Sequence, residues 1–252
     1  MILKHKKLII VIIGGVALSS CINKKSQGEI EEGFEKVLSM YPTKNLMDFY
    51  DMEGYRDSEF EEGDKGVWWI YSTMSISKDE ESPLETEGML LRLNRNTRTA
   101  EGFYIQRNTP ENTKKETEEH KYPIYYDETG IHLQEEIADS NLKNKVENFQ
   151  FFVQYANFKD LGKYKTIRKM YNPEVPMYEL EYQLTNDDWN VKQLRERYDI
   201  PTKEAPTLLL KGVGKLEGSS LGYKQLEFTF DKKIDVFFTD FIDYQPSSEE
   251  GA

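Results

Sequence analysis

The stretch GMLLRLNRNTRTAEGFY, residues 88–104, alternates apolar and polar side chains on both sides of a short polar segment. Before that segment every second residue is apolar: Met89, Leu91 and Leu93. The polar residues 94–97 favour a tight turn, and a second extended run centred on Phe103 and Ile105 follows them. A period of two on both sides of a turn is typical of paired antiparallel strands. The stretch therefore predicts a β-hairpin.

The same period of two recurs along most of the chain. Upstream, VWWIYSTMSIS at 67–77 predicts a strand that precedes the hairpin. Downstream, further strands are expected at 122–126, 131–134, 177–184, 208–213, 225–230 and 234–241. The highly charged stretch 107–121 between them is expected to be a loop.

Four segments instead show the 3.6-residue period of amphipathic helices. The first ends before Pro42 and has one apolar stripe, formed by Ile30, Phe34, Val37, Leu38 and Tyr41. The other three each follow a residue type that caps helices, and the expected caps are Thr43, Asp139 or Ser140, and Asn186. The acidic, glycine-punctuated segment 51–66 is expected to be a loop.

The order helix, strands, helix, strands predicts an α+β fold in which antiparallel β-meanders pack with a few helices. We expect a single domain over 29–245, followed by a flexible tail at 246–252. Because a second helix-then-strand block follows the first, two similar lobes divided near residue 138 are an alternative, although no residue-level repeat supports it.

The N-terminus, MILKHKKLIIVIIGGVALSSC, has the pattern of an export signal. Three lysines precede an apolar run that is too short for the roughly 20 residues of a membrane-spanning helix. The sequence Leu18-Ser19-Ser20-Cys21 resembles the lipobox of bacterial lipoproteins. That resemblance implies a signal peptide at 1–20, cleavage between Ser20 and Cys21, a diacylglyceryl group on the Cys21 sulfur, and a linker over 21–28. An ordinary signal cleaved after Ser19 is the alternative.

Cysteine usage and charge restrict the possible partners. Cys21 is the single cysteine, so the chain forms no internal disulfide and depends on its core for stability. The chain has a net charge of −12. Without residues 1–20, which hold three lysines and no acid, 30 basic and 45 acidic residues remain, a net charge of −15. This balance argues against a nucleic-acid partner and against the body lying flat on an anionic membrane.

Catalytic motifs are each incomplete. Gly218 to Gly222 satisfies GxSxG, but no histidine follows Ser220 to activate it. His120 and His132 lack the spacing of a zinc site. Adjacent acids such as Asp187 and Asp188 are common in so acidic a chain and fit the first turn of a helix. We therefore expect no enzyme activity, no metal and no cofactor.

Aromatic residues are abundant, with 16 tyrosines, 13 phenylalanines and 3 tryptophans. Tyrosine suits recognition surfaces because it joins apolar area to a polar tip. Candidate surface tyrosines are Tyr104, Tyr125, Tyr126 and Tyr223. They would suit a small-ligand or glycan site, while the alternative is that they cover the edge of the core.

Taken together, several motifs resemble the staphylococcal tandem lipoprotein family. They are the lipobox, YPTKNLMDFYDMEGYRDSEFEEGDKGVWW (41–69), the stretch 88–104, and NDDWNVKQLRERYDIPTKEAPTLLLKGVGKLEGSSLGYKQLEFTF (186–230). The resemblance implies a surface protein of a Gram-positive cell, anchored by lipid on the extracellular face of the cell membrane. It also implies contact with host cells during invasion through a heat-shock chaperone, and immune stimulation by the lipid through a Toll-like receptor. Only Cys21 carries over as a functional residue.

Overall fold

The computed structural model describes residues 25–247, except 57, 112–115, 160, 175 and 215–223. The described strands are β1 (Val67–Ile76), β2 (Leu84–Asn94), β3 (Thr99–Thr109), β4 (Glu118–Asp127), β5 (Gly130–Leu133), β6 (Lys165–Asn172), β7 (Met177–Gln183), β8 (Thr207–Val213), β9 (Lys224–Asp231) and β10 (Val236–Gln245). The described helices are α1 (Gln27–Leu38), α2 (Ser140–Glu147), α3 (Trp189–Arg197) and the 3₁₀ helices η1 (Leu46–Tyr50), η2 (Phe152–Gln154) and η3 (Leu161–Lys163).

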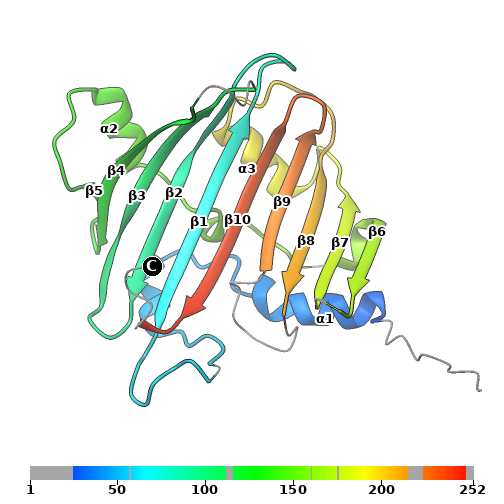
Figure 1. Ribbon diagram of the computed structural model, residues 1–252, viewed down its shortest axis with the longest axis horizontal. Coiled ribbons are helices and arrows are strands. Elements are labelled where there is room, and N and C mark those ends of the chain that lie inside the picture. Colours follow the sequence, from blue (N-terminus) through cyan, green and yellow to red (C-terminus); the bar gives the residue numbers. More distant parts are fainter. Residues whose placement is uncertain are drawn as a thin grey trace, which may run out of the picture.

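All ten strands join one antiparallel sheet in the order β5-β4-β3-β2-β1-β10-β9-β8-β7-β6, as Figure 1 shows. Two five-stranded meanders meet in the middle, where β1 and β10 pair from Val67–Gln245 to Ile76–Val236. The expected antiparallel meanders with a few helices are confirmed, and the fold is mainly β. The alternative of two lobes divided near residue 138 is not confirmed, since this central pairing makes one continuous sheet.

The helical segments cover one face of the sheet, called here the inner face. From η1, the Phe49 ring contacts Trp68 of β1, with centroids 5.4 Å apart. From η2, Phe152 contacts Phe238 of β10 at 5.0 Å. Trp68 and Phe238 lie on the same face of the sheet. In the register, even-numbered residues of β1 lie opposite even-numbered residues of β10, and alternate residues of a strand share one face. The core therefore lies between the sheet and a single helical layer.

Helix α1 confirms the first expected stripe, because all five residues of that stripe are buried. Ser26 caps the helix in a capping box with Glu29, so the first turn begins inside the stretch expected to be linker. Asp139 caps α2 as expected. The other two expected caps are wrong: Asn45 caps η1 in place of Thr43, and Asp188 caps α3 in place of Asn186.

The expected loop at 107–121 is wrong at both ends. Strand β3 continues to Thr109 and β4 begins at Glu118. Arg107 lies opposite Glu119 in the register, and their side chains form an ion pair of 2.5 Å. A strand stabilised by opposite charges shows no apolar–polar alternation, which is why its sequence was interpreted as a loop.

Strand β6 was missed by the sequence analysis. Its register with β7 shifts between Thr166 and Arg168, so Ile167 is an extra residue in a bulge. A bulge reverses the alternation of side chains along a strand and thus removes the period of two. Among the described residues, no helix is long and apolar enough to cross a membrane.

Candidate functional site

The inner face of the sheet changes from apolar to polar toward one end of β2 and β3. Along β2, Met89 and Leu91 are buried, and the next residue of the same parity is Glu87. Glu87 lies opposite Gln106 of β3, which lies opposite His120 of β4. Since the same face is core elsewhere, these polar positions mark a corner that the helical layer leaves accessible.

Two adjoining cavities of about 530 and 630 Å³ lie over this corner, and they share Glu87, Lys145 and Asp199. Together they form a groove between α2 and the end of α3, called here the α2–α3 groove. Its two ends differ in character. One is lined by polar residues that include Gln106, Asn108 and His120, and the other by rings that include Tyr104, Phe149 and Tyr198.

Fixed charges cross the middle of the groove. Lys145 of α2 forms an ion pair of 2.5 Å with Glu87, and the Tyr104 hydroxyl donates to the same carboxylate at 3.3 Å. Burial, with the nearby Glu87 charge, raises the pKa of Tyr104 well above its usual range, so its hydroxyl stays a donor.

At the aromatic end, the Arg197 guanidinium lies 3.8 Å from the centroid of the Tyr155 ring and donates to Gln150 at 3.0 Å. Stacking on a ring fixes the position of a guanidinium, so this cation is held in place before any ligand arrives. Apolar rings beside a few fixed polar groups are the usual lining of a small-molecule site.

Beneath the helical layer, Asp240 of β10 is fully buried. It accepts hydrogen bonds from the Tyr41 and Ser72 hydroxyls, both 2.5 Å long, and the Ser72 oxygen in turn accepts from the backbone N–H of Phe152 at 3.1 Å. Burial raises the pKa of Asp240 to about 7, although these hydrogen bonds act in the opposite direction. The carboxyl group therefore ties β1, η2 and the end of α1 together.

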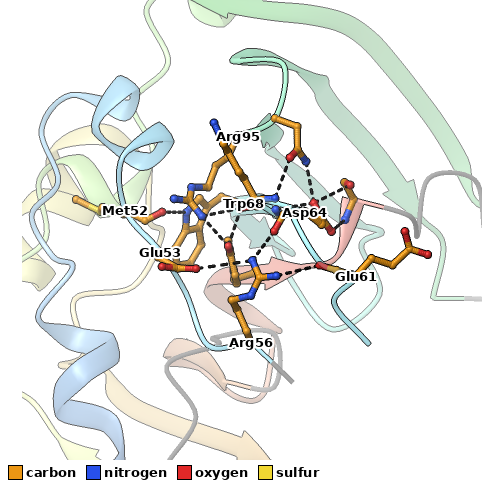
Figure 2. Close-up of polar contacts among 12 residues, drawn as sticks. Met52, Glu53, Arg56, Glu61, Asp64, Trp68 and Arg95 are labelled. Atoms are coloured by element: carbon orange, nitrogen blue, oxygen red, sulfur yellow. Dashed lines mark hydrogen bonds and ion pairs between the residues drawn. The ribbon is translucent and has the colours of Figure 1, made fainter. Parts of the chain in front are cut away.

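The acidic loop 51–66 folds back on the sheet, as Figure 2 shows, and its described residues, all but 57, form no helix or strand, as expected. Arg95, in the turn between β2 and β3, donates to the Lys65 carbonyl at 2.6 Å and to the Tyr50 carbonyl at 3.2 Å. Trp68 donates to the Met52 carbonyl at 3.2 Å. These bonds fix the two ends of the loop beside β1.

Within the loop, Asp64 is the centre of a second network. Its carboxylate accepts hydrogen bonds from the Asn96 side chain, the Gly66 backbone and both donors of Ser247, each 2.8 Å long. Burial opposes ionisation here, but these hydrogen bonds outweigh it and hold the pKa of Asp64 at about 2. Arg56 adds hydrogen bonds to the Asp64 and Glu61 carbonyls, which close the loop on itself (Figure 2).

Several residues singled out in the sequence lie outside the described part of the chain: Ser20, Cys21, Ser220 and Tyr223. Of the other candidates, His120 lines the α2–α3 groove. His132 bonds to the Thr129 hydroxyl at 2.7 Å and stacks on the ring of Tyr125, with centroids 4.8 Å apart. Its partners make it part of the β4–β5 hairpin.

The expected surface tyrosines divide into different environments. Tyr104 is fully buried, so its assignment to the surface is wrong, although it belongs to the wall beneath the groove. Tyr125 is 41% exposed and Tyr126 is half-buried. The sequence analysis missed Glu87, Lys145 and Asp199. One signal was available in the sequence. Glu87 is a charged residue at a position that continues the alternate, apolar positions of Met89 and Leu91.

Across the described ranges, no group of three or more His, Cys, Asp or Glu residues could hold a metal ion.

Known proteins similar to this chain are lipoproteins of staphylococci. A protein of Staphylococcus epidermidis strain RP62A named "uncharacterized lipoprotein" is 51% identical over 97% of this chain and 99% of its own length. Two proteins from Staphylococcus aureus carry the same name. That of strain MSSA476 is 49% identical over 97% of this chain and 93% of its own length. That of strain N315 is 51% identical over 96% of this chain and 94% of its own length.

The sequence model of the Csa1 family matches residues 26–247, so the chain belongs to this family. The resemblance to the staphylococcal tandem lipoproteins is thereby confirmed. A crystal structure of a DUF1329 family protein from Desulfovibrio piger aligns with 88% of this chain and 95% of its own at 8% identity. The TM-score of this alignment is 0.20.

Proposed function

We propose that this chain is a non-enzymatic surface lipoprotein, exported by the signal peptide at 1–20 and held on the extracellular face of the cell membrane by a diacylglyceryl group on Cys21. The observation that carries the proposal is the position of the single cysteine, directly after an apolar signal and Leu18-Ser19-Ser20. The lipoprotein names of the relatives support it. One acyl chain binds a membrane only marginally, so two chains on one sulfur suit a stable anchor.

Replacing Cys21 with alanine is expected to abolish acylation and to release the protein into the medium, while the fold stays intact because residue 21 precedes α1. Loss of the lipid should also abolish stimulation of a Toll-like receptor. Mass spectrometry of protein from the native host, together with a receptor reporter assay, measures both effects. Equal stimulation by the variant, in material free of other lipoproteins, would contradict the proposal.

For the folded body we propose contact with host cells, in line with the family resemblance, which implies a heat-shock chaperone as partner. The body carries a net charge of −15 after removal of the signal, and its loop 51–66 is held rigidly beside β1. A rigid surface loses little conformational entropy on binding, which favours recognition.

The alternative function is binding of a small ligand or glycan in the α2–α3 groove. The specific observation in its favour is a concave site of several hundred Å³ that combines tyrosine rings with a fixed lysine, carboxylate and amides. Such a mixture of rings and hydrogen-bonding groups suits a molecule rich in hydroxyls.

One binding experiment tests both ideas. The Cys21→Ala protein, fluorescently labelled, is expected to bind host cells above the level of an unrelated acidic lipoprotein. If the groove makes the contact, Lys145→Ala should lower binding about tenfold, and soluble saccharides should compete. Lys233→Ala, a change at an exposed lysine of the β9–β10 turn outside both the groove and loop 51–66, is the matched control. Binding no greater than that of the unrelated protein would refute host contact.

A further inference from the structure

The chain enters the fold beside the edge strand β6. At the start of α1, Gln27 donates from its side-chain amide to the Thr166 hydroxyl of β6 at 2.9 Å. One turn later, Glu31 accepts from the Tyr182 hydroxyl of β7 at 2.9 Å. Figure 1 shows α1 crossing one end of the half of the sheet that contains β6 to β9. The first turn of α1 is thus fixed to the β6 edge.

Cys21 lies four residues before Lys25, the first residue that the structure describes. Four residues span at most about 14 Å when fully extended. A lipid on Cys21 would therefore hold the β6 edge within roughly that distance of the lipid headgroups. This reach is comparable to the Debye length of about 8–10 Å at physiological ionic strength, so charges on β6 would interact with charged headgroups.

Strand β6 and the segment before it carry a net positive charge, opposite in sign to that of the whole chain, whereas the adjoining helix α1 holds four acids and one lysine. The segment 159–172 holds five basic residues and one acid, in a protein whose net charge is −12. Arg168 forms ion pairs with Glu179 and Glu181, which neutralise it. Lys165 and Lys169 are exposed, and the bulged Ile167 between them is 46% exposed.

One acidic segment lies far from this edge. Loop 51–66 holds seven acids and two basic residues and is fixed beside β1. Strands β10, β9, β8 and β7 separate β1 from β6. Five strand spacings of about 4.8 Å amount to about 24 Å, which is more than two Debye lengths. Repulsion between this loop and an anionic membrane is therefore screened when β6 faces the bilayer.

We propose that the β6 edge faces the membrane and that Lys165 and Lys169 bind anionic phospholipid headgroups beside the anchor. This orientation rests on the proposed lipidation of Cys21. A lipid chain combined with a nearby basic surface is the usual pairing of two signals in stable membrane attachment. The overall negative charge then orients the body, with the acidic loop directed away from the surface.

The test uses the mature chain coupled through its single cysteine to a maleimide lipid. The vesicles contain phosphatidylglycerol and phosphatidylcholine in equal parts, or phosphatidylcholine alone. Lysine acylation is quantified by mass spectrometry. Lys165 and Lys169 are expected to react about fivefold more slowly on the anionic vesicles. The reason is that attraction to an anionic surface stabilises each nearby lysine by about 1 kcal/mol, or about fivefold in its bound population. Lys65 and Lys121 should react equally on both, and high salt should remove the difference.

The double variant K165E/K169E should lose the protection, reported by acylation of neighbouring Lys163, whereas the matched variant K65E/K121E should keep it. Equal reactivity on both vesicle types would overturn the proposal. So would a K165E/K169E variant that changes only the oligomeric state, because lysines and a bulge also protect edge strands from pairing with other chains. Because the lipid is attached chemically, the outcome does not depend on native acylation of Cys21. Mass spectrometry of the native protein tests that acylation separately.

Discussion

Replacing Phe152 with alanine is expected to lower the free energy of unfolding by about 3–5 kcal/mol. The side chain is fully buried at the centre of the helical layer. Its ring contacts five other aromatic rings, with centroids 5.0 to 6.0 Å away: Tyr41, Tyr155, Phe158, Phe228 and Phe238. Removal leaves a cavity that these large, mutually packed rings cannot fill without leaving their own contacts.

Urea denaturation followed by tryptophan fluorescence measures this loss, with an unchanged m-value as evidence that the unfolded state is the same. Phe103→Ala is the matched control. It makes the same chemical change at a side chain that is 40% exposed on the outer face. The control should cost under about 1 kcal/mol. Equal losses at both positions would show that η2 does not hold the layer together.

Stability is expected to fall as the pH rises from 4 to 7, and Asp240 is the cause. Its pKa is about 7 in the fold and 3.8 in the unfolded chain, so in this range the folded state binds the additional proton. The contribution is fully present below pH 4 and is lost as the pH passes 7. The nearby tyrosines, Tyr41, Tyr155 and Tyr198, have raised pKa values and stay neutral throughout.

Asp240→Asn should remove this pH dependence and make the protein more stable than the wild type at pH 8, because no charge is then buried. The difference should be a few kcal/mol. Asp64→Asn is a control of opposite sign. The pKa of Asp64 is lowered to about 2, so its contribution is present above pH 4 and is lost as the pH falls toward 2. A wild-type profile that is flat between pH 4 and 7 would contradict the assignment to Asp240.

Local patterns predicted the elements whose apolar positions keep one period. The stripe of α1 and the hairpin over 88–104 are confirmed because each buries a single regular face. Strand β6 could not be predicted, since its bulge at Ile167 reverses the alternation. The ends of β3 and β4 were missed because charges, rather than apolar residues, pair across them.

The sheet order and the α2–α3 groove lay beyond such patterns. Lys145 and Glu87 are 58 positions apart in the chain and meet only because α2, which packs against β5, brings the Lys145 side chain to Glu87 of β2. A pattern of neighbouring residues holds no information about such a distance. The charged residue at a core position, Glu87, was the one local sign that a polar corner exists.

The pairing of the first and last strands has a consequence for how this protein reaches its native state. The chain is synthesised from its N-terminus, so β1 emerges with its neighbour β2 but without β10. The β1–β10 pairing at the middle of the sheet cannot form until almost the whole polypeptide has been synthesised, and closing so long a loop is slow. Completion of the fold is thus a late step, and truncation just before β10 leaves β1 and β9 each with an unpaired edge.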